Sequence, residues 1–373
     1  MAPYSRDKVV GTVKFFFLNS HAHRALDLAE TKVSGGAELQ VALLAKELAR
    51  RGHGVTIAGG DSGQKEHRVI DGVTLRTAGR FHTGAWADTV GAIPKVARLL
   101  GETKPDFVCV LGWTAWLDLL CTARRAFGYK VVYICGLDPE IDGTFGRTHG
   151  WKGKLFERGV RRSDYRFAMS DYQSELFCKL GLPHGFYRNL IRPRVSPRKN
   201  GKSVDLLWVA RCQKIKRPHL FLDLAERLPD ASCEMICPRE DAGLWEGVAT
   251  RARSLPNVVF RESVPYAEIQ ERYDTARFLV STSKAEGFPN NMIQAAQGGA
   301  GILSLEVDPD GFIKKFRAGF CAEDDFEKLV QETRAKLADS RGAELAGNGA
   351  ERMVAEWLDN DANTEAFLKH LGA

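Results

Sequence analysis

The sequence contains no long hydrophobic run. A membrane-spanning helix needs about 18 or more consecutive apolar residues. The closest approach in this 373-residue chain is the segment 107–117, whose pattern is typical of a buried strand that runs into a loop. The N-terminus, MAPYSRDKVV, also lacks the apolar stretch and the cleavage site of a secretory signal peptide. We therefore expect a cytoplasmic protein that does not cross a membrane.

A strong charge of one sign is lacking as well. The chain has 53 Lys and Arg against 47 Asp and Glu, and this net charge of +6 is too dilute to indicate a polyanionic partner such as nucleic acid. The eight cysteines are scattered singly through hydrophobic stretches, and no pair of histidines has the spacing of a metal site. This pattern is typical of reduced, buried thiols and indicates neither a disulfide framework nor a zinc site.

Glycine, in contrast, is in excess, with 36 of 373 residues, about 10% against a background of about 7%. Apolar runs alternate with amphipathic helices along the whole chain, as a parallel α/β sheet requires. The segment 191–202, IRPRVSPRKNGK, interrupts this alternation with a composition typical of a linker. The pattern predicts two Rossmann-like domains, at 1–190 and 203–345, and C-terminal helices at 346–373 that return to the N-terminal domain.

Two short segments bring together residue types that suit a phosphate-bearing ligand. In the loop SGGAELQ, Gly35 and Gly36 open a helix whose free N–H groups favour an anion, although an ordinary tight turn explains the same residues. Arg211 and Lys216 follow the first strand of the second domain, where two cations suit a diphosphate. The alternative at this second place is a solvated basic turn.

A third segment, STSKAEGFPNNMIQAAQGG at 281–299, follows another strand of the second domain. A glycine-proline turn presents Glu286, and a helix starts near Asn290 with its N–H groups directed toward the same crevice. One carboxylate beside a helix N-terminus suits a ligand that has both hydroxyl and phosphate groups. An ordinary capped helix explains the Asn and the Pro but not the exposed Glu.

In order and spacing, these segments resemble the retaining GT-B glycosyltransferases of family 4. The segment GGAELQVALLAKELARRGHGVTI (35–57) resembles the family's opening loop and helix, DLLWVARCQKIKRPHLFLDL (205–224) its phosphate segment, and 257–296 its most diagnostic region. The resemblance implies an α/β GT-B fold, in which an acceptor-side domain (1–190) and a nucleotide-sugar donor domain (203–345) enclose a ligand cleft.

The same resemblance implies a nucleotide-diphosphate sugar as co-substrate, no metal, no cofactor, and transfer with retention at the anomeric carbon. Arg211 and Lys216 would hold the diphosphate, and Glu286, the first acid of the family's E-x7-E motif, would contact the donor sugar. The donor-binding positions implied in this way are Gly35, Gly36, Val264, Pro265, Gly287, Phe288, Pro289, Asn290, Asn291 and Gln294. Of these, Val264 and Pro265 would lie against the nucleobase.

Two positions depart from the family pattern. The second acid of the E-x7-E motif is replaced by Gln294. An amide still accepts a hydrogen bond from a ribose hydroxyl, but losing the charge-assisted part costs about 1 kcal/mol, or about fivefold in affinity. The family's histidine after the strand at 131–134 is also missing, and Asp138 is the nearest polar candidate for an acceptor or sugar contact. An Asp before Pro is equally typical of a turn.

Two further features leave alternatives open. Residues 147–166 hold seven basic and two acidic residues, which suits either an anionic membrane surface or a solvated helix packed on the sheet. The motif Asp308-Pro309-Asp310 has the D-x-D form that binds a divalent metal in other glycosyltransferases. It falls in a loop late in the second domain, and we expect no metal there.

The main hypothesis is a retaining glycosyltransferase acting on a glycan or lipid-linked acceptor in cell-surface polysaccharide or glycolipid synthesis. It would be cytoplasmic, either free or peripheral on the inner face of the membrane. A second hypothesis is a catalytically weak nucleotide-sugar-binding partner subunit, marked by Gln294. A DNA-modifying sugar transferase is the third. It would need a concentrated basic cleft, and 147–166 is the only basic cluster in the sequence.

Overall fold

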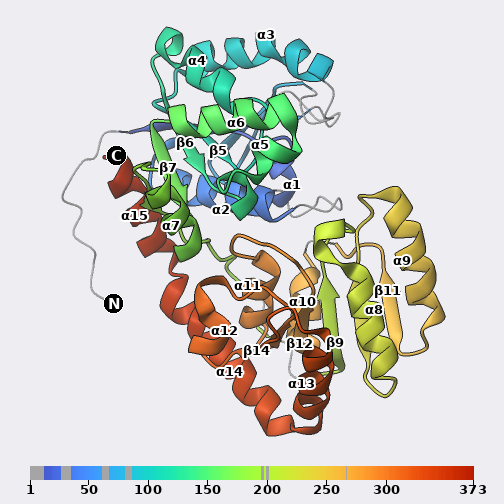
Figure 1. The fold of residues 1–373 in the computed structure, drawn as a ribbon. Helices are drawn as coiled ribbons and strands as arrows, with labels where there is room; N and C mark the ends of the chain where they lie inside the picture. Colours follow the sequence, from blue (N-terminus) through green and yellow to red (C-terminus); the bar gives the residue numbers. More distant parts are fainter. Residues whose placement is uncertain are drawn as a thin grey trace, which may run out of the picture.

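The computed structural model describes residues 12–26, 35–60, 67–79, 86–194, 197–198, 201–265 and 267–373. These residues form two α/β domains, each built on its own mainly parallel sheet with helices packed against it (Figure 1). The two Rossmann-like halves predicted from the alternation of strands and helices are therefore confirmed.

The N-terminal domain contains an eight-stranded sheet in the order β3-β4-β2-β1-β5-β6-β7-β8. Its strands are β1 (Lys14–Leu18), β2 (Gly54–Gly59), β3 (His67–Ile70), β4 (Val73–Thr77), β5 (Phe107–Leu111), β6 (Lys130–Ile134), β7 (Tyr165–Ala168) and β8 (Gly185–Phe186). Its helices are α1 (Ala22–Leu26), α2 (Gly36–Arg50), α3 (Trp86–Thr103), α4 (Leu117–Phe127), η1 (Asp138–Glu140), α5 (Thr144–Thr148), α6 (Gly150–Arg162) and α7 (Asp171–Lys179). Within the described residues, the only antiparallel pair is the edge hairpin of β3 and β4, which was not predicted.

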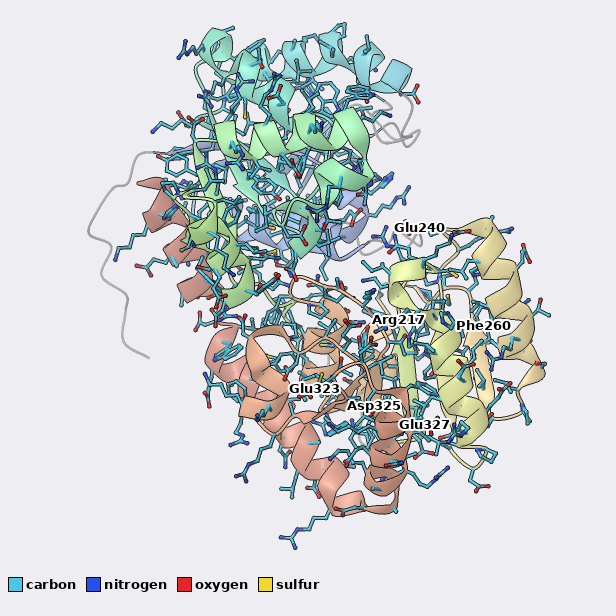
Figure 2. The ribbon with its side chains drawn as sticks, in the orientation of Figure 1. Arg217, Glu240, Phe260, Glu323, Asp325 and Glu327 are labelled. Carbon is cyan, nitrogen blue, oxygen red and sulfur yellow. The ribbon has the colours of Figure 1, made fainter. Side chains whose placement is uncertain are left out.

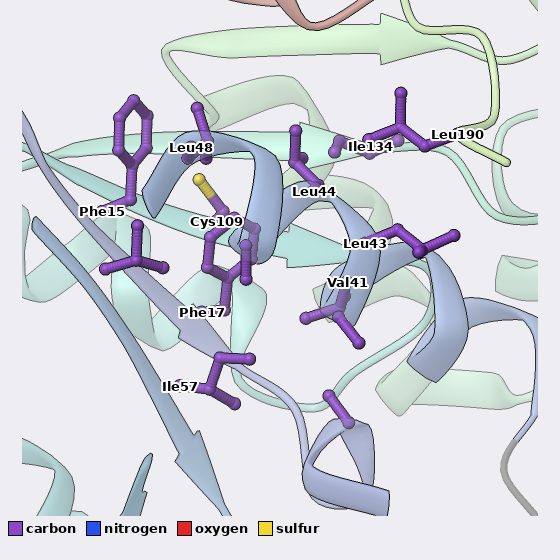
Figure 3. Close-up of a cluster of buried hydrophobic side chains, with 14 of the residues drawn as sticks. Phe15, Phe17, Val41, Leu43, Leu44, Leu48, Ile57, Cys109, Ile134 and Leu190 are labelled. Carbon is purple, nitrogen blue, oxygen red and sulfur yellow. The ribbon is translucent and has the colours of Figure 1, made fainter. Parts of the chain in front are cut away.

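Strand β1 and helix α2 form much of the core of this domain. Four of the five residues of β1 are buried, because it is a central strand covered on both faces. The predicted apolar stripe of α2, at Val41, Leu44 and Leu48, packs in the same cluster as Phe15 and Phe17 of β1 (Figure 3). This packing fixes α2 on the sheet and so fixes its N-terminus at the carboxyl ends of the strands.

The C-terminal domain contains a six-stranded parallel sheet in the order β11-β10-β9-β12-β13-β14. Its strands are β9 (Val204–Val209), β10 (Cys233–Ile236), β11 (Val258–Arg261), β12 (Ala276–Ser281), β13 (Gly301–Ser304) and β14 (Gly319–Cys321). Its helices are η2 (Lys214–Lys216), α8 (Pro218–Arg227), α9 (Ala242–Ser254), α10 (Ile269–Thr275), α11 (Asn290–Gln297), η3 (Pro309–Gly311), α12 (Phe312–Lys315), α13 (Phe326–Ala338) and α14 (Ser340–Trp357). The strand order reverses between β9 and β12, and ligand crevices of such sheets open at this point.

The C-terminal helices divide between the two domains. Helix α14 stays with the C-terminal domain, because Ala346 and Ala350 are buried in the core clusters of that domain. Helix α15 (Asn360–Leu371) lies on the N-terminal domain, beside β7 in Figure 1, and Phe367 joins the core there. The chain therefore crosses at 358–360, between α14 and α15.

The two chain crossings between the domains are hydrogen-bonded to each other. The Ile191 N–H donates to Asn360 Oδ1 at 2.8 Å, and Asn360 Nδ2 donates to the Ile191 carbonyl at 2.8 Å. Farther along the predicted linker, Arg194 pairs with Asp274, and Lys202 donates to the Asp274 carbonyl. The described linker residues are thus bound to the C-terminal domain and do not form a free tether.

The basic segment 147–166 is not one continuous helix. It spans the end of α5, all of α6 and the start of β7, with a break at Gly150, whose φ is 56°. Phe156 and Val160 are buried in the core of the N-terminal domain, whereas Trp151 is 59% exposed. No helix among the described residues has the length and apolar character needed to cross a bilayer.

Candidate active site

A cleft of about 430 Å³ lies between the two domains. Its lining comes from segments that follow β1, β5, β6 and β7 in one domain and β9, β10 and β12 in the other. The cleft is therefore at the carboxyl ends of both sheets, where open α/β folds bind ligands. The predicted site residues that line it are Gly35, Gly36, Arg211, Lys216, Glu286, Gly287, Phe288, Pro289, Asn290, Asn291 and Gln294.

Two loops of the C-terminal domain, 210–217 after β9 and 282–289 after β12, are tied together by hydrogen bonds. Thr282 Oγ1 donates to the Lys216 carbonyl at 2.6 Å. Arg217, labelled in Figure 2, donates from Nε to the Thr282 carbonyl at 2.7 Å. Because β9 and β12 are neighbours at the centre of the sheet, these bonds fix one loop against the other.

This arrangement brings Lys216 and Glu286 together as an ion pair inside the cleft. Glu286 Oε1 accepts from Lys216 Nζ and also from Ser283 Oγ, the latter at 2.7 Å. The Lys216 and Glu286 side chains are only 15% and 10% exposed. Removing one partner of such a pair leaves a largely buried charge unpaired, which is strongly destabilising. Each side chain therefore holds the other in place.

Arg211 lies in the cleft on the side of Glu240. Its Nη1 is 3.1 Å from Glu240 Oε2, and Figure 2 shows Glu240 at the edge of the C-terminal domain that faces the N-terminal domain. The guanidinium carbon is 3.5 Å from the position that a Cβ on Gly35 would occupy, so Arg211 reaches the opposite wall. Both side chains are about 40% exposed, and an exposed pair of this kind contributes little stability. A ligand phosphate can therefore take the place of Glu240 at small cost.

The N-termini of α2 and α11 meet at the cleft, one from each domain. Asn290 Nδ2 donates to the Gly36 carbonyl at 3.2 Å, and Gln40 Nε2 donates to Asn290 Oδ1 at 2.7 Å. Asn189 lies just before the chain crosses into the C-terminal domain, and its Nδ2 donates to the Phe288 carbonyl at 2.8 Å. A Cβ on Gly36 would lie 2.7 Å from Asn290 Nδ2, so only glycine permits this approach without a shift. Two positive helix ends therefore border the cleft, which favours an anion there.

Gly287 touches the N-terminal domain. A Cβ at this position would lie 2.5 Å from the carbonyl oxygen of Gly136, in the loop after β6. This distance is too short for any side chain, and the contact atom is backbone that cannot rotate away. Gly287 thus sets how closely the two domains approach, in addition to the donor contact predicted for it.

Glu140, which the sequence did not single out, also lines the cleft. Its side chain is buried, with 2% exposure. Oε2 accepts from the Tyr133 hydroxyl at 2.5 Å and from the Gly136 N–H at 3.0 Å, while Oε1 accepts from the Trp113 N–H at 3.1 Å. Burial raises the pKa of Glu140 to about 7, although its hydrogen-bond donors act in the opposite direction. The one sequence feature that could have indicated Glu140 is its position as an acid shortly after the buried strand β6.

Two positions predicted to lie against the nucleobase do not line the cleft. Val264 is buried in a core cluster of the C-terminal domain, because the loop after β11 turns its side chain inward. Pro265 is exposed next to it. In the same domain Pro238 and Tyr273 line the cleft instead, together with Gln294.

The remaining predicted acids have partners outside the cleft lining. Asp138 accepts from Gln173 Nε2 at 3.0 Å, and burial raises the pKa of Asp138 to about 6. In the D-x-D segment, Asp308 accepts from the N–H of α12, and Asp310 pairs with Arg188 of the N-terminal domain. Within the described part of the chain, no group of three or more His, Cys, Asp or Glu side chains is placed to hold a metal ion.

Comparisons with known proteins agree with this geometry. Residues 34–186 match the family model described as Glycosyltransferase Family 4, and no curated protein sequence matches the chain. Sucrose-phosphate synthase from Thermosynechococcus elongatus superposes with a TM-score of 0.78 at 13% identity, over 96% of this chain and 98% of that one. WaaG, a glycosyltransferase involved in lipopolysaccharide biosynthesis, gives 0.70 at 15% identity, over 97% and 100%. HepE from Anabaena, in complex with UDP, gives 0.68 at 15%, over 96% and 100%. The chain has the GT-B fold that its resemblance to family 4 implied.

Gly287→Ala is expected to force the two domains apart. Overpacking of this kind costs about 1–3 kcal/mol, so we expect denaturant unfolding to show a loss of stability of that size. The matched control is Gly247→Ala in α9, where a Cβ would meet nothing within 4 Å. That variant should gain about 0.5–1 kcal/mol of stability from the alanine. Equal stabilities for the two variants would contradict a close contact of Gly287 with the N-terminal domain.

Proposed function

We infer that this chain, which has the GT-B fold and matches Glycosyltransferase Family 4 over residues 34–186, is a retaining, metal-independent glycosyltransferase. It would transfer a sugar from a nucleotide-diphosphate sugar to a glycan or lipid-linked acceptor, in cell-surface polysaccharide or glycolipid synthesis. The observation that carries this proposal is the largely buried Lys216–Glu286 pair, which lies in the interdomain cleft with Arg211 and two helix N-termini.

The cations of this cleft suit the leaving diphosphate. When the bond between the anomeric carbon and the diphosphate oxygen breaks, negative charge builds on that oxygen. Arg211, Lys216 and the N-terminus of α11 are in place before the reaction, so they stabilise the charge without reorganising. In this scheme the protein's own cations supply the positive charge that a metal ion supplies in metal-dependent glycosyltransferases.

Glu286 suits the donor sugar. Lys216 and Ser283 both bind its Oε1, which leaves Oε2 to accept from a sugar hydroxyl. Retention at the anomeric carbon is proposed from the resemblance of 257–296 to the diagnostic region of the family.

The rival hypothesis of a DNA-modifying enzyme is disfavoured by the cleft itself. Among the described residues that line its N-terminal wall there is no Lys or Arg to bind a duplex.

Glu286→Ala tests whether the chain is an enzyme. We expect the variant to hydrolyse UDP-, GDP- or ADP-glucose without acceptor at least about a hundredfold more slowly than the wild type, the loss typical of removing a preorganised polar group. The control is Glu327→Ala, which removes an exposed carboxylate that is paired with Arg227 and lies outside the cleft lining. A wild type that binds the nucleotide but hydrolyses none of these donors would favour the partner-subunit hypothesis.

Gln294→Glu tests the donor site at the position where the family motif departs. Gln294 lines the cleft on α11. A carboxylate there accepts a charge-assisted bond from a ribose hydroxyl, so calorimetry should show about fivefold tighter binding of the same nucleoside diphosphate. Asn291 lies on a neighbouring face of the same helix, and its side chain donates to the Val209 carbonyl at 3.0 Å. A marked loss of affinity in Gln294→Glu would mean that the motif alignment is wrong.

A peripheral position on the inner membrane face is also proposed. Its support is the outer side of α6, where Lys154, Arg158 and Arg161 are exposed beside Trp151. Flotation with vesicles of phosphatidylglycerol and phosphatidylcholine should recover the protein at low salt, with much less on phosphatidylcholine alone. Lys154→Glu combined with Arg161→Glu should reduce recovery, whereas Lys336→Glu on α13 should not. Absence of flotation at low salt with anionic vesicles would leave α6 as a solvated, domain-packed helix.

A further inference from the structure

The two walls of the cleft differ in charge. The C-terminal wall carries Arg211, Lys216 and Glu286. On the N-terminal wall, the charged residues among the described lining are Glu38 and Glu140, and the other side chains toward β5, β6 and β7 are apolar. The part of this wall toward β5, β6 and β7 lies away from the positive N-terminus of α2, and an apolar wall with a few polar groups suits an uncharged organic ligand.

Trp113 is the largest side chain of the N-terminal wall. Its indole packs on a cluster of rings, with centroid distances of 5.3 Å to Phe145, 5.0 Å to Phe156 and 5.9 Å to His149. The residue is only partly buried and lines the cleft. Three neighbouring rings therefore hold the indole in one orientation at the wall of the cleft.

The loops that carry Trp113 and Gly136 are packed closely together. Gly112 and Gly136 follow β5 and β6 side by side, and a Cβ on Gly136 would lie 3.0 Å from Gly112 Cα and 3.1 Å from Glu140 Oε1. Glu140 accepts from the N–H of Trp113 and of Gly136, so one buried carboxylate fixes both loops. The backbone that carries the indole is therefore held in place.

We propose that Trp113 is the platform for a sugar ring of the acceptor, and that Glu140 is the positioning residue that fixes it. One face of a pyranose ring presents mainly C–H groups, and an aromatic side chain buries that apolar face while leaving the hydroxyls at its edge free. This inference rests on the proposed function and names its acceptor class. The group that receives the transferred sugar belongs to a saccharide, whether or not a lipid is attached farther away.

The test uses full-length protein with UDP present and three probes: the methyl α-glycosides of glucose, mannose and galactose. Saturation-transfer difference NMR should show signal from the ring C–H protons of at least one probe. Trp113→Ala should weaken that binding by about tenfold, the size expected for loss of an aromatic stacking contact, and Trp113→Phe should restore most of it. Tyr172→Ala, which removes a half-exposed ring of the same domain outside the cleft lining, should keep the signal.

Glu140→Gln separates positioning from mere stability. It should weaken the probe signal while circular dichroism shows the protein still folded, because one of the three donors to the carboxylate then faces an amide N–H₂.

Calorimetry with UDP, GDP and ADP on the same samples separates this proposal from the proposed function. If none of UDP, GDP and ADP binds the wild type, the donor site itself is wrong. If UDP binds but the probes give no signal, or Trp113→Ala binds them as the wild type does, the acceptor platform is wrong. Equal Trp113-dependent signals from n-butanol would also overturn it, by showing an apolar site without preference for sugars.

Discussion

The cleft depends on one largely buried ion pair, Lys216 with Glu286. Two charges taken out of water lose hydration, and their attraction offsets this loss only when the geometry is good and the remaining polar groups are satisfied. The strand order supplies that geometry, because the loops that carry the pair follow the adjacent central strands β9 and β12. Arg217 and Thr282 then bind one loop to the other. A pair kept at this cost inside a cavity is more typical of a binding site than of a stabilising core, because well-packed apolar residues would serve a core equally well.

The second constraint is the polar contact between the domains. Asn290 on α11 accepts hydrogen bonds from Gln40 on α2 and from Asn189, which precedes the chain crossing. Gln40 also donates to the Leu190 carbonyl. An ion pair joins Arg188 of the N-terminal domain to Asp310 of the C-terminal domain. Hydrogen bonds of this kind exchange with water at a small net free-energy difference, about 0.5–1.5 kcal/mol each. An interface built from them separates more readily than an apolar one. The Asn360–Ile191 bonds join the two chain crossings beside this polar interface.

Much of the fold and of the C-terminal wall could be predicted from the sequence, because the signals are local. Apolar runs of four to six residues gave the strands, and the order of Arg211, Lys216 and Glu286 along the chain sufficed to place them at strand ends. The burial of the Val264 side chain could not be predicted, because a one-residue change in a turn decides whether a side chain enters the core. Glu140 was missed for another reason. Its burial depends on donors at positions 113, 133 and 136, which only the pairing of β5 with β6 brings together.

The two acids of the cleft, Glu286 and Glu140, show how the fold assigns different chemistry to its two walls. Glu286 forms an ion pair with Lys216 on the wall that carries the cations. The hydrogen-bond donors of Glu140 are a tyrosine hydroxyl and two backbone N–H groups, all neutral, and burial raises the pKa of Glu140 to about 7. A raised carboxyl pKa means that the folded protein binds this proton more tightly than the unfolded chain. As the pH rises from about 4.5 to 7, the contribution of Glu140 to stability therefore declines. Below neutral pH Glu140 is therefore mostly uncharged, which suits uncharged hydroxyls on that wall, while Arg211 and Lys216 lie on the C-terminal wall.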